Sequence, residues 1–166
     1  MGSDRHYLTI LGVGNILLAD EGFGVHFVRR LEEGFTFPDG VRLIDGGVLA
    51  YTLLDEICSC KHLIVIDAIK LTDLPGSIYR FTKEELETRL PPPTSAHEVA
   101  FPDVLFKAEL LGELPEVIFL CIIPQQYEEM SLEMTPLMTE RLPDMEGLLL
   151  EELARLNVSW RRKTDA

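Results

Sequence analysis

The sequence predicts an α/β fold in which a twisted, mostly parallel sheet lies between two layers of helices. Two observations lead to this prediction. Short apolar or β-branched runs alternate along the chain with segments of helical apolar spacing, which is typical of parallel sheets covered by helices. The run Leu63–Ile66 is also continuously apolar, as expected of a central strand buried on both faces. The 166 residues fit a single domain, 1–166.

Five runs have the composition of strands, so we expect a three-layer fold with a sheet of about five strands. The fourth run alternates in polarity and follows Pro75-Gly76, which favours a strand at the edge of the sheet. In chain order, the predicted strands are Tyr7–Gly12, Val41–Asp45, Leu63–Ile66, Ser77–Phe81 and Glu116–Ile123.

Helices are predicted between and after these strands. Ser95 with Glu98 three residues later matches a capping box, so a helix should begin there and hold His97 in its first turn. Pro102 is expected to disturb or restart this helix, and Pro143 is expected to break the last one. The predicted helices are Phe23–Phe35, about Leu49–Cys60, Lys83–Leu90, Ser95–Leu111 and Thr135–Leu156.

The charge of the chain argues against nucleic acid as a partner. Fifteen Lys and Arg against 28 Asp and Glu give a formal net charge of −13, and such a field repels phosphate backbones and anionic membranes. The basic cluster Arg161–Lys163 is expected to belong to a solvated tail, residues 157–166. Apolar runs fall short of the roughly 20 residues that span a bilayer, so membrane insertion is not expected.

The cysteines and the N-terminal residues favour a cytoplasmic protein. Cys58, Cys60 and Cys121 are odd in number, and two of them stand only two residues apart, unlike the framework of a secreted disulfide protein. The polar start Met1–His6 lacks the apolar stretch of a signal peptide and is expected to be disordered or left over from cloning.

The best place for a functional site is the edge of the sheet beyond the carboxyl ends of its strands, where loops can meet without breaking the sheet. Two or three carboxylates and an imidazole there would suit nickel, zinc, cobalt or manganese, with coordination positions left for a substrate group or a water. The polar residues expected at this edge are Asn15, Asp20, Glu21, Asp45, Asp67 and His97.

Four of these residues also have a structural interpretation. Asp20 fits a helix N-cap, and Glu21 fits a first-turn carboxylate favoured by the helix dipole. Asp67 fits the cap of a turn, and a histidine such as His97 often does no more than satisfy a nearby carbonyl. Residue types and spacing alone therefore indicate a metal or carboxylate site without establishing it.

Other constellations are weaker. Gly12-Val13-Gly14 matches part of a dinucleotide-binding loop, but Leu17 stands where the third glycine belongs, and the acidic residues that follow would oppose a phosphate. His26 and Arg30, four residues apart on the first helix, are expected on a solvated face. Cys58 and Cys60 are expected on a helix as small buried side chains.

The segment Gly12–Val25, GVGNILLADEGFGV, resembles the opening signature of the nickel-iron hydrogenase maturation peptidases. It departs mildly from that family at Asp20-Glu21, where many relatives have two aspartates. The resemblance covers nearly the whole chain. Further segments in the family's order and at similar intervals are Leu43–Gly47, His62–Ile69, Ser95–Glu98, Ile122–Gln125 and Thr135-Pro136.

This resemblance implies an endopeptidase that removes a short C-terminal extension from the precursor of the hydrogenase large subunit after nickel insertion. It also implies that Glu21, Asp67 and His97 form the metal site. Our hypothesis is that cysteine thiolates of the precursor already hold the nickel, so the metal is a recognition motif carried by the substrate. Zinc or cadmium could replace it in vitro.

The hydrolytic step has two candidate forms. Either a water polarised by the metal attacks the amide, or Asp20 or Asp45 acts as general base, with Asp45 favoured in a supporting role. The alternative functions are a non-catalytic nickel-binding chaperone on the same fold and a nucleotide-binding module. The residues expected to meet the substrate backbone are Gly14, Asn15, Gly46 and Gly47.

Overall fold

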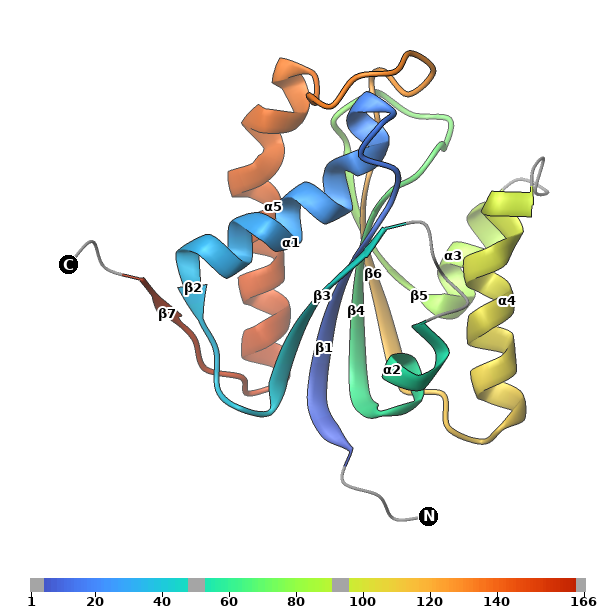
Figure 1. Cartoon of the computed structure of the whole chain (residues 1–166), viewed down its shortest axis with the longest axis vertical. Coiled ribbons are helices and arrows are strands. Elements are labelled where there is room, and N and C mark those ends of the chain that lie inside the picture. Colours follow the sequence, from blue (N-terminus) through green and yellow to red (C-terminus); the bar gives the residue numbers. More distant parts are fainter. Residues whose placement is uncertain (1–4, 48–52, 91–95, 164–166) are drawn as a thin grey trace.

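The computed structural model describes residues 5–47, 53–90 and 96–163, with the backbone alone described for residues 96–100. Its main sheet has five strands in the order β3-β1-β4-β6-β5, as Figure 1 shows. Neighbouring strands pair in parallel from β3 to β6, and β5 pairs antiparallel at the edge. The bounds are β1 His6–Val13, β3 Val41–Gly47, β4 Cys60–Ala68, β5 Ile78–Thr82 and β6 Glu116–Ile122. The predicted fold class is confirmed.

Helices cover both faces of this sheet (Figure 1). On one face lie α1 (Phe23–Gly34) and α5 (Pro136–Arg155), and on the other lie α2 (Leu54–Cys58), α3 (Lys83–Arg89) and α4 (Ala96–Leu110). Strand β4 sends Ile64 and Ile66 toward α1 and α5, and Leu63 and Val65 toward the other layer. This division explains its continuously apolar sequence, because a strand that alternates its side chains needs apolar residues for two cores.

The two helices with internal prolines run without a break. Pro102 lies inside α4 and Pro143 inside α5, so the expected restart and break are wrong. Both proline residues are exposed. The carbonyl that loses its hydrogen-bond partner can therefore bond to water, while buried residues such as Met145 and Leu149 hold α5 on the sheet.

The segment predicted as a helix over about Leu49–Cys60 is shorter. Residues 48–52 lie outside the described part of the chain, α2 ends at Cys58, and Cys60 begins β4 opposite His6 of β1. Cys60 is therefore buried on a strand and not on a helix. His6 belongs to β1, so the expected irregular start reaches too far, and residues 1–4 lie outside the described part.

The chain end pairs with the body of the protein, and Arg161–Lys163 are exposed, as expected of a solvated segment. A second, two-stranded sheet pairs β7 (Arg161–Arg162) antiparallel with β2 (Phe35–Thr36), so Phe35 lies on a strand beyond the end of α1. Arg162 donates to the buried Glu146 carboxylate at 2.8 Å, and its guanidinium lies 4.9 Å from the Phe35 ring centroid. Arg162 is thus paired because a buried acid and an aromatic face are available to it.

Among the described helices, none combines the length and apolar character needed to cross a lipid bilayer.

Candidate active site

The site begins where β1 and β4 end. A short 3₁₀ helix, η1 (Ala19–Gly22), follows β1 and leads into α1. These segments, the loops after β4 and β6, and the start of α4 all lie at the upper end of the molecule in Figure 1. This is the carboxyl edge of the parallel strands, where the sequence predicts the site.

Glycines bring η1 and α1 close to this edge. A Cβ on Gly24 would lie 2.1 Å from the carbonyl oxygen of Ile66, directly before Asp67. A Cβ on Gly12 would lie 2.2 Å from the Gly24 oxygen, and one on Gly14, whose φ is +135°, would lie 1.9 Å from the Glu21 oxygen. The glycines of the signature therefore allow a backbone approach that any side chain would block, and that approach places Glu21 beside Asp67.

Glu21 and Asp67 form an acidic pair. Burial, and next the charge of Glu21, raise the pKa of the Asp67 carboxyl well above its usual 3.8, against a lowering by the backbone N–H of Ala68. Two carboxylates that interact electrostatically in a poorly hydrated place disfavour a doubly ionised state. A bound cation would relieve that repulsion, so the pair has the chemistry of a cation site.

A lysine that sequence reasoning missed lies against this pair. Lys70 Nζ is 3.2 Å from Glu21 Oε1 and 4.5 Å from the ring centroid of Tyr127. Lys70 and Tyr127 also line a pocket of about 240 Å³ between the loops after β4 and β6. A lysine three residues after Asp67 carries no motif signal, because only the fold brings its head group to η1.

His97 belongs to the first turn of α4, as predicted, but its side chain lies outside the described part of the structure. The side chains that are described form no group of three or more His, Cys, Asp or Glu able to hold a metal ion. Of the three predicted metal ligands, the structure thus describes the side chains of Glu21 and Asp67.

Asp20 is fully buried and has a structural position. Its Oδ2 accepts hydrogen bonds from the backbone N–H groups of Gln125 and Gln126, both at 2.9 Å, and its Oδ1 accepts from that of Thr135 at 2.7 Å. The Thr135 hydroxyl donates to the same carboxylate. Asp20 therefore ties η1 to the loop after β6 and to the start of α5. Of the segments that Asp20 joins, the sequence predicted only the start of the last helix, at Thr135-Pro136.

Asp45 lies at the end of β3 and is paired with an arginine. Arg29 donates to Asp45 Oδ2 through its Nη2 at 2.9 Å and its Nε at 3.2 Å. Gly46 is buried against Leu11 and Leu53, so it packs inside the molecule. Gly47, with φ +52°, has open space around its Cα and accepts a hydrogen bond from the Gly14 N–H at 3.0 Å.

Asn15 shapes the loop that leads into η1. Its side-chain oxygen accepts a hydrogen bond from the Leu17 N–H at 2.9 Å, and its backbone oxygen accepts one from the Leu18 N–H. Leu17 in turn accepts a backbone hydrogen bond from Ser131 at 2.8 Å, which joins this loop to the one after β6. The two loops are therefore one connected surface.

The expected solvated face of α1 holds for Arg30, which is exposed and paired with an acid, and is wrong for His26. Arg30 Nε donates to the buried Glu146 at 3.2 Å. His26 is partly buried, and among the described residues its Nε2 is buried without a hydrogen-bond partner. Burial, then the charge of Arg29, lower the His26 pKa, against a smaller raising by Asp45.

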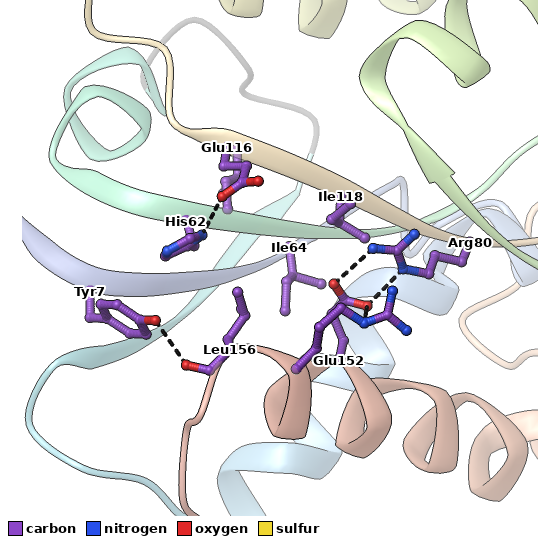
Figure 2. Close-up of a pocket in the computed structure, with 10 residues that line it drawn as sticks. Tyr7, His62, Ile64, Arg80, Glu116, Ile118, Glu152 and Leu156 are labelled. Atoms are coloured by element: carbon purple, nitrogen blue, oxygen red, sulfur yellow. Dashed lines mark hydrogen bonds and ion pairs between the residues drawn. The ribbon is translucent and has the colours of Figure 1, made fainter.

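A larger pocket of about 330 Å³ lies at the opposite edge, where β1, β4 and β6 begin (Figure 2). Its polar groups are paired with each other. Arg80 donates to Glu152 at 2.7 and 3.0 Å, and the Tyr7 hydroxyl donates to the Leu156 oxygen at 2.8 Å. The predicted site residues do not line this pocket, so it carries no candidate function.

The three-layer fold with an acidic pair at the carboxyl edge of its sheet defines an α/β protein whose site occupies the usual place of an active site in this class. A family model described as hydrogenase maturation protease matches residues 25–152. The chain belongs to this family of peptidases.

Known relatives agree with this assignment. The chain is 33% identical over 168 residues to the hydrogenase expression/formation protein HupD of Thiocapsa roseopersicina, covering all of this chain and 76% of that protein. It is 37% identical over 123 residues to the hydrogenase 2 maturation protease of Escherichia coli, covering 73% of this chain and 75% of that one.

Solved structures agree as well. The hydrogenase maturating endopeptidase HybD from E. coli superposes with a TM-score of 0.89 at 31% identity, over 96% of this chain and 99% of that one. The [NiFe] hydrogenase maturation protease HybD from Thermococcus kodakarensis has a TM-score of 0.72 at 24% identity, over 88% and 98%, which supports the fold alone.

Proposed function

We propose that this peptidase removes the C-terminal extension from the nickel-loaded precursor of a hydrogenase large subunit, and that Glu21, Asp67 and His97 bind the nickel that the precursor carries. The observation that carries this proposal is the acidic pair. Burial, and next the charge of Glu21, raise the pKa of Asp67, so the site favours a cation brought to it.

The nickel is part of the substrate in this proposal. Cysteine thiolates of the precursor hold the ion, and harder carboxylate oxygens and an imidazole nitrogen of the peptidase complete its coordination. Neither partner alone supplies the full ligand set, so the affinity for the precursor rises only after nickel has been inserted. Zinc or cadmium, which accept the same donors, would replace nickel in vitro.

The roles of the two remaining acids follow from their bonding. Asp20 is a positioning residue, because its two oxygens accept hydrogen bonds from three backbone N–H groups and a hydroxyl and fix η1 to the loop after β6 and to the start of α5. Asp45 has the more exposed carboxylate, 36%, and supports the hydrolytic step as general base or through Arg29. The alternative to a water activated by Asp45 is a water polarised by the metal.

The precursor docks on an apolar rim around the pair. We define this rim by four exposed side chains on the loops after β1, β4 and β6: Leu17, Leu74, Met130 and Leu132, which are 47% to 77% exposed. Backbone hydrogen bonds of Ser131 with Leu17 and Ala19 hold two of these loops together. A folded precursor offers a protein surface, and exposed apolar side chains that gather on one part of a protein mark a contact site.

We place the reaction in the cytoplasm. The three cysteines all lie in the described part of the chain and are free thiols, as in a reducing compartment.

The test uses the loaded and unloaded precursor. Purified peptidase is incubated with each, and mass spectrometry follows release of the C-terminal peptide. Release is expected from the loaded precursor only, and Asp67→Asn should reduce it at least about a hundredfold, the scale of losing a group that acts on the transition state. Asp39→Asn, an equal charge change at an exposed turn before β3, is the control and should cleave normally.

Equal cleavage of loaded and unloaded precursor would contradict the role of nickel. Nickel-dependent binding without any release of peptide would match the chaperone alternative instead. ATP or NAD raising the melting temperature, with no effect of nickel, would favour the nucleotide-binding module.

A further inference from the structure

We propose that Lys70 is a tethered cation that occupies Glu21 while the substrate is absent and that excludes free metal ions from the site. This inference rests on the proposed function, since it assigns a specificity-determining role at the same carboxylate pair.

The position of Lys70 is the first argument. It lies two residues after the end of β4, whose last residues are Asp67-Ala68, and its Nζ lies 3.2 Å from Glu21 Oε1. The Glu21 side chain is 17% exposed and that of Lys70 is 44% exposed. A solvent-reaching cation thus covers a largely buried carboxylate.

The second argument is the charge of the free site. Glu21 and Asp67 are two acids at the same edge of the sheet, and a positive charge beside Glu21 offsets their mutual repulsion. Lys70 supplies that charge before substrate arrives. A metal ion on Glu21 must therefore displace the ammonium group, so the two cations compete for one oxygen pair.

The third argument is that the Lys70 ammonium group has a second favourable position away from Glu21. Its Nζ already lies 4.5 Å from the ring centroid of Tyr127, and both residues line the pocket of about 240 Å³. When Glu21 is taken by the metal, the ammonium group can keep its contact with the ring face and remain hydrated in this pocket. Displacement therefore requires rotation of one flexible side chain and no change of the backbone.

Competition of this kind favours metal on the precursor over metal in solution. A tethered competitor lowers the apparent affinity for any ion by the same factor, about three- to tenfold for a partly exposed pair. A loaded precursor offsets this factor through its contacts with the apolar rim, whereas a free ion has no such contacts. The site therefore binds nickel held by the precursor in preference to free nickel.

The experiment measures nickel binding to the free peptidase by calorimetry, without precursor. Lys70→Gln should bind nickel about three- to tenfold more tightly than wild type, and Lys70→Arg, which keeps the charge, should stay within about twofold. Lys83→Gln is the matched control. It removes an equal charge from a lysine that is paired with Glu87 at 2.7 Å, at the start of α3 and level with the first residues of β6.

The results separate this inference from the proposed site. In a Glu21→Gln background, Lys70→Gln should no longer change nickel affinity, because the oxygen for which the cations compete is gone. If Glu21→Gln weakens nickel binding but Lys70→Gln leaves it equal or weaker, the role of Lys70 is wrong and the site stands. If Glu21→Gln leaves nickel binding unchanged, the proposed site fails as well. Melting temperatures within about 2 °C of wild type confirm that each variant is folded.

Discussion

At the scale of single residues, the acids of the signature divide by their partners. Asp20 is fully buried with its oxygens bonded to three backbone N–H groups and the Thr135 hydroxyl, whereas Glu21, its neighbour, meets Asp67 and Lys70. The sequence places both residues at the predicted site, Glu21 as a metal ligand and Asp20 as a candidate general base. The structure separates them, because Asp20 points into the protein and Glu21 toward the carboxyl edge of the sheet.

Asp20→Asn should destabilise the fold by about 2 kcal/mol or more, because an amide places donors where the carboxylate accepts from backbone N–H groups. Urea unfolding measures this change. Asp39→Asn should shift the unfolding free energy by less than about 0.5 kcal/mol, as exposed positions usually do. A stable Asp20→Asn protein that has lost all cleavage would show a chemical role for Asp20 and contradict the positioning role.

His26 should make stability depend on pH. Its pKa is lowered in the folded protein, chiefly by burial, so the unfolded chain binds the proton more readily. The stabilisation is therefore complete above the unfolded value of 6.5 and is lost as the pH falls from there toward the folded pKa. Thermal unfolding should show a larger fall for wild type than for His26→Gln between about pH 7.5 and pH 5. Parallel falls would contradict this effect.

At the scale of elements, much of the fold was predictable because it depends on local pattern. The five strands and the helices Phe23–Gly34 and Lys83–Arg89 follow from apolar periodicity, which the two cores require. The continuity of α5 through Pro143 was not predictable, because tertiary packing and an exposed position decide it. The pairing of β2 with β7 was missed for the same reason, since two-residue strands leave no periodic signal.

The site was predictable to a similar degree. Functional groups in open α/β folds gather beyond the carboxyl ends of the strands, which predicted Glu21 and Asp67 at one edge of the sheet. The structure places both residues at that edge. Lys70 could not be found in this way, because its contact with Glu21 depends on the close approach of η1 to β4. That approach depends in turn on Gly24, whose missing side chain is a structural requirement that a sequence pattern alone does not explain.

Gly24→Ala should therefore disturb both stability and metal binding. The new Cβ would meet the Ile66 oxygen at 2.1 Å, so α1 and η1 must move away from β4 at a cost above about 3 kcal/mol. Gly34→Ala in the same helix has nothing within 4 Å of its Cβ and should be neutral or stabilising by up to about 1 kcal/mol. Calorimetric unfolding of both variants checks this, and equal melting temperatures would contradict it.

At the scale of the whole molecule, two ends of the sheet have different properties. The amino edge holds the larger pocket, whose charged groups are paired internally, as Figure 2 shows. The carboxyl edge holds the acidic pair and the apolar rim. With a net charge of −13, the molecule would also attract a basic segment of the precursor to the site from a distance.

The apolar rim should contribute to precursor binding and not to the chemical step. The double variant Met130→Ser, Leu132→Ser should raise KM by about three- to tenfold with kcat nearly unchanged, because both side chains are exposed and their loss removes contact area only. Phe106→Ser, Leu110→Ser on α4 is the matched control with similar exposure. An equal rise of KM in both double variants would place the docking surface elsewhere.

The central claim is that Glu21 and Asp67 complete the coordination of nickel carried by the precursor, and X-ray absorption at the nickel edge tests it most directly. Spectra are recorded for loaded precursor alone, with the peptidase, and with a Glu21→Gln, Asp67→Asn variant. The account predicts that oxygen or nitrogen ligands join the sulfur ligands only when the unaltered peptidase is present. A nickel spectrum that stays the same in all three samples, while the precursor is still cleaved, would contradict it.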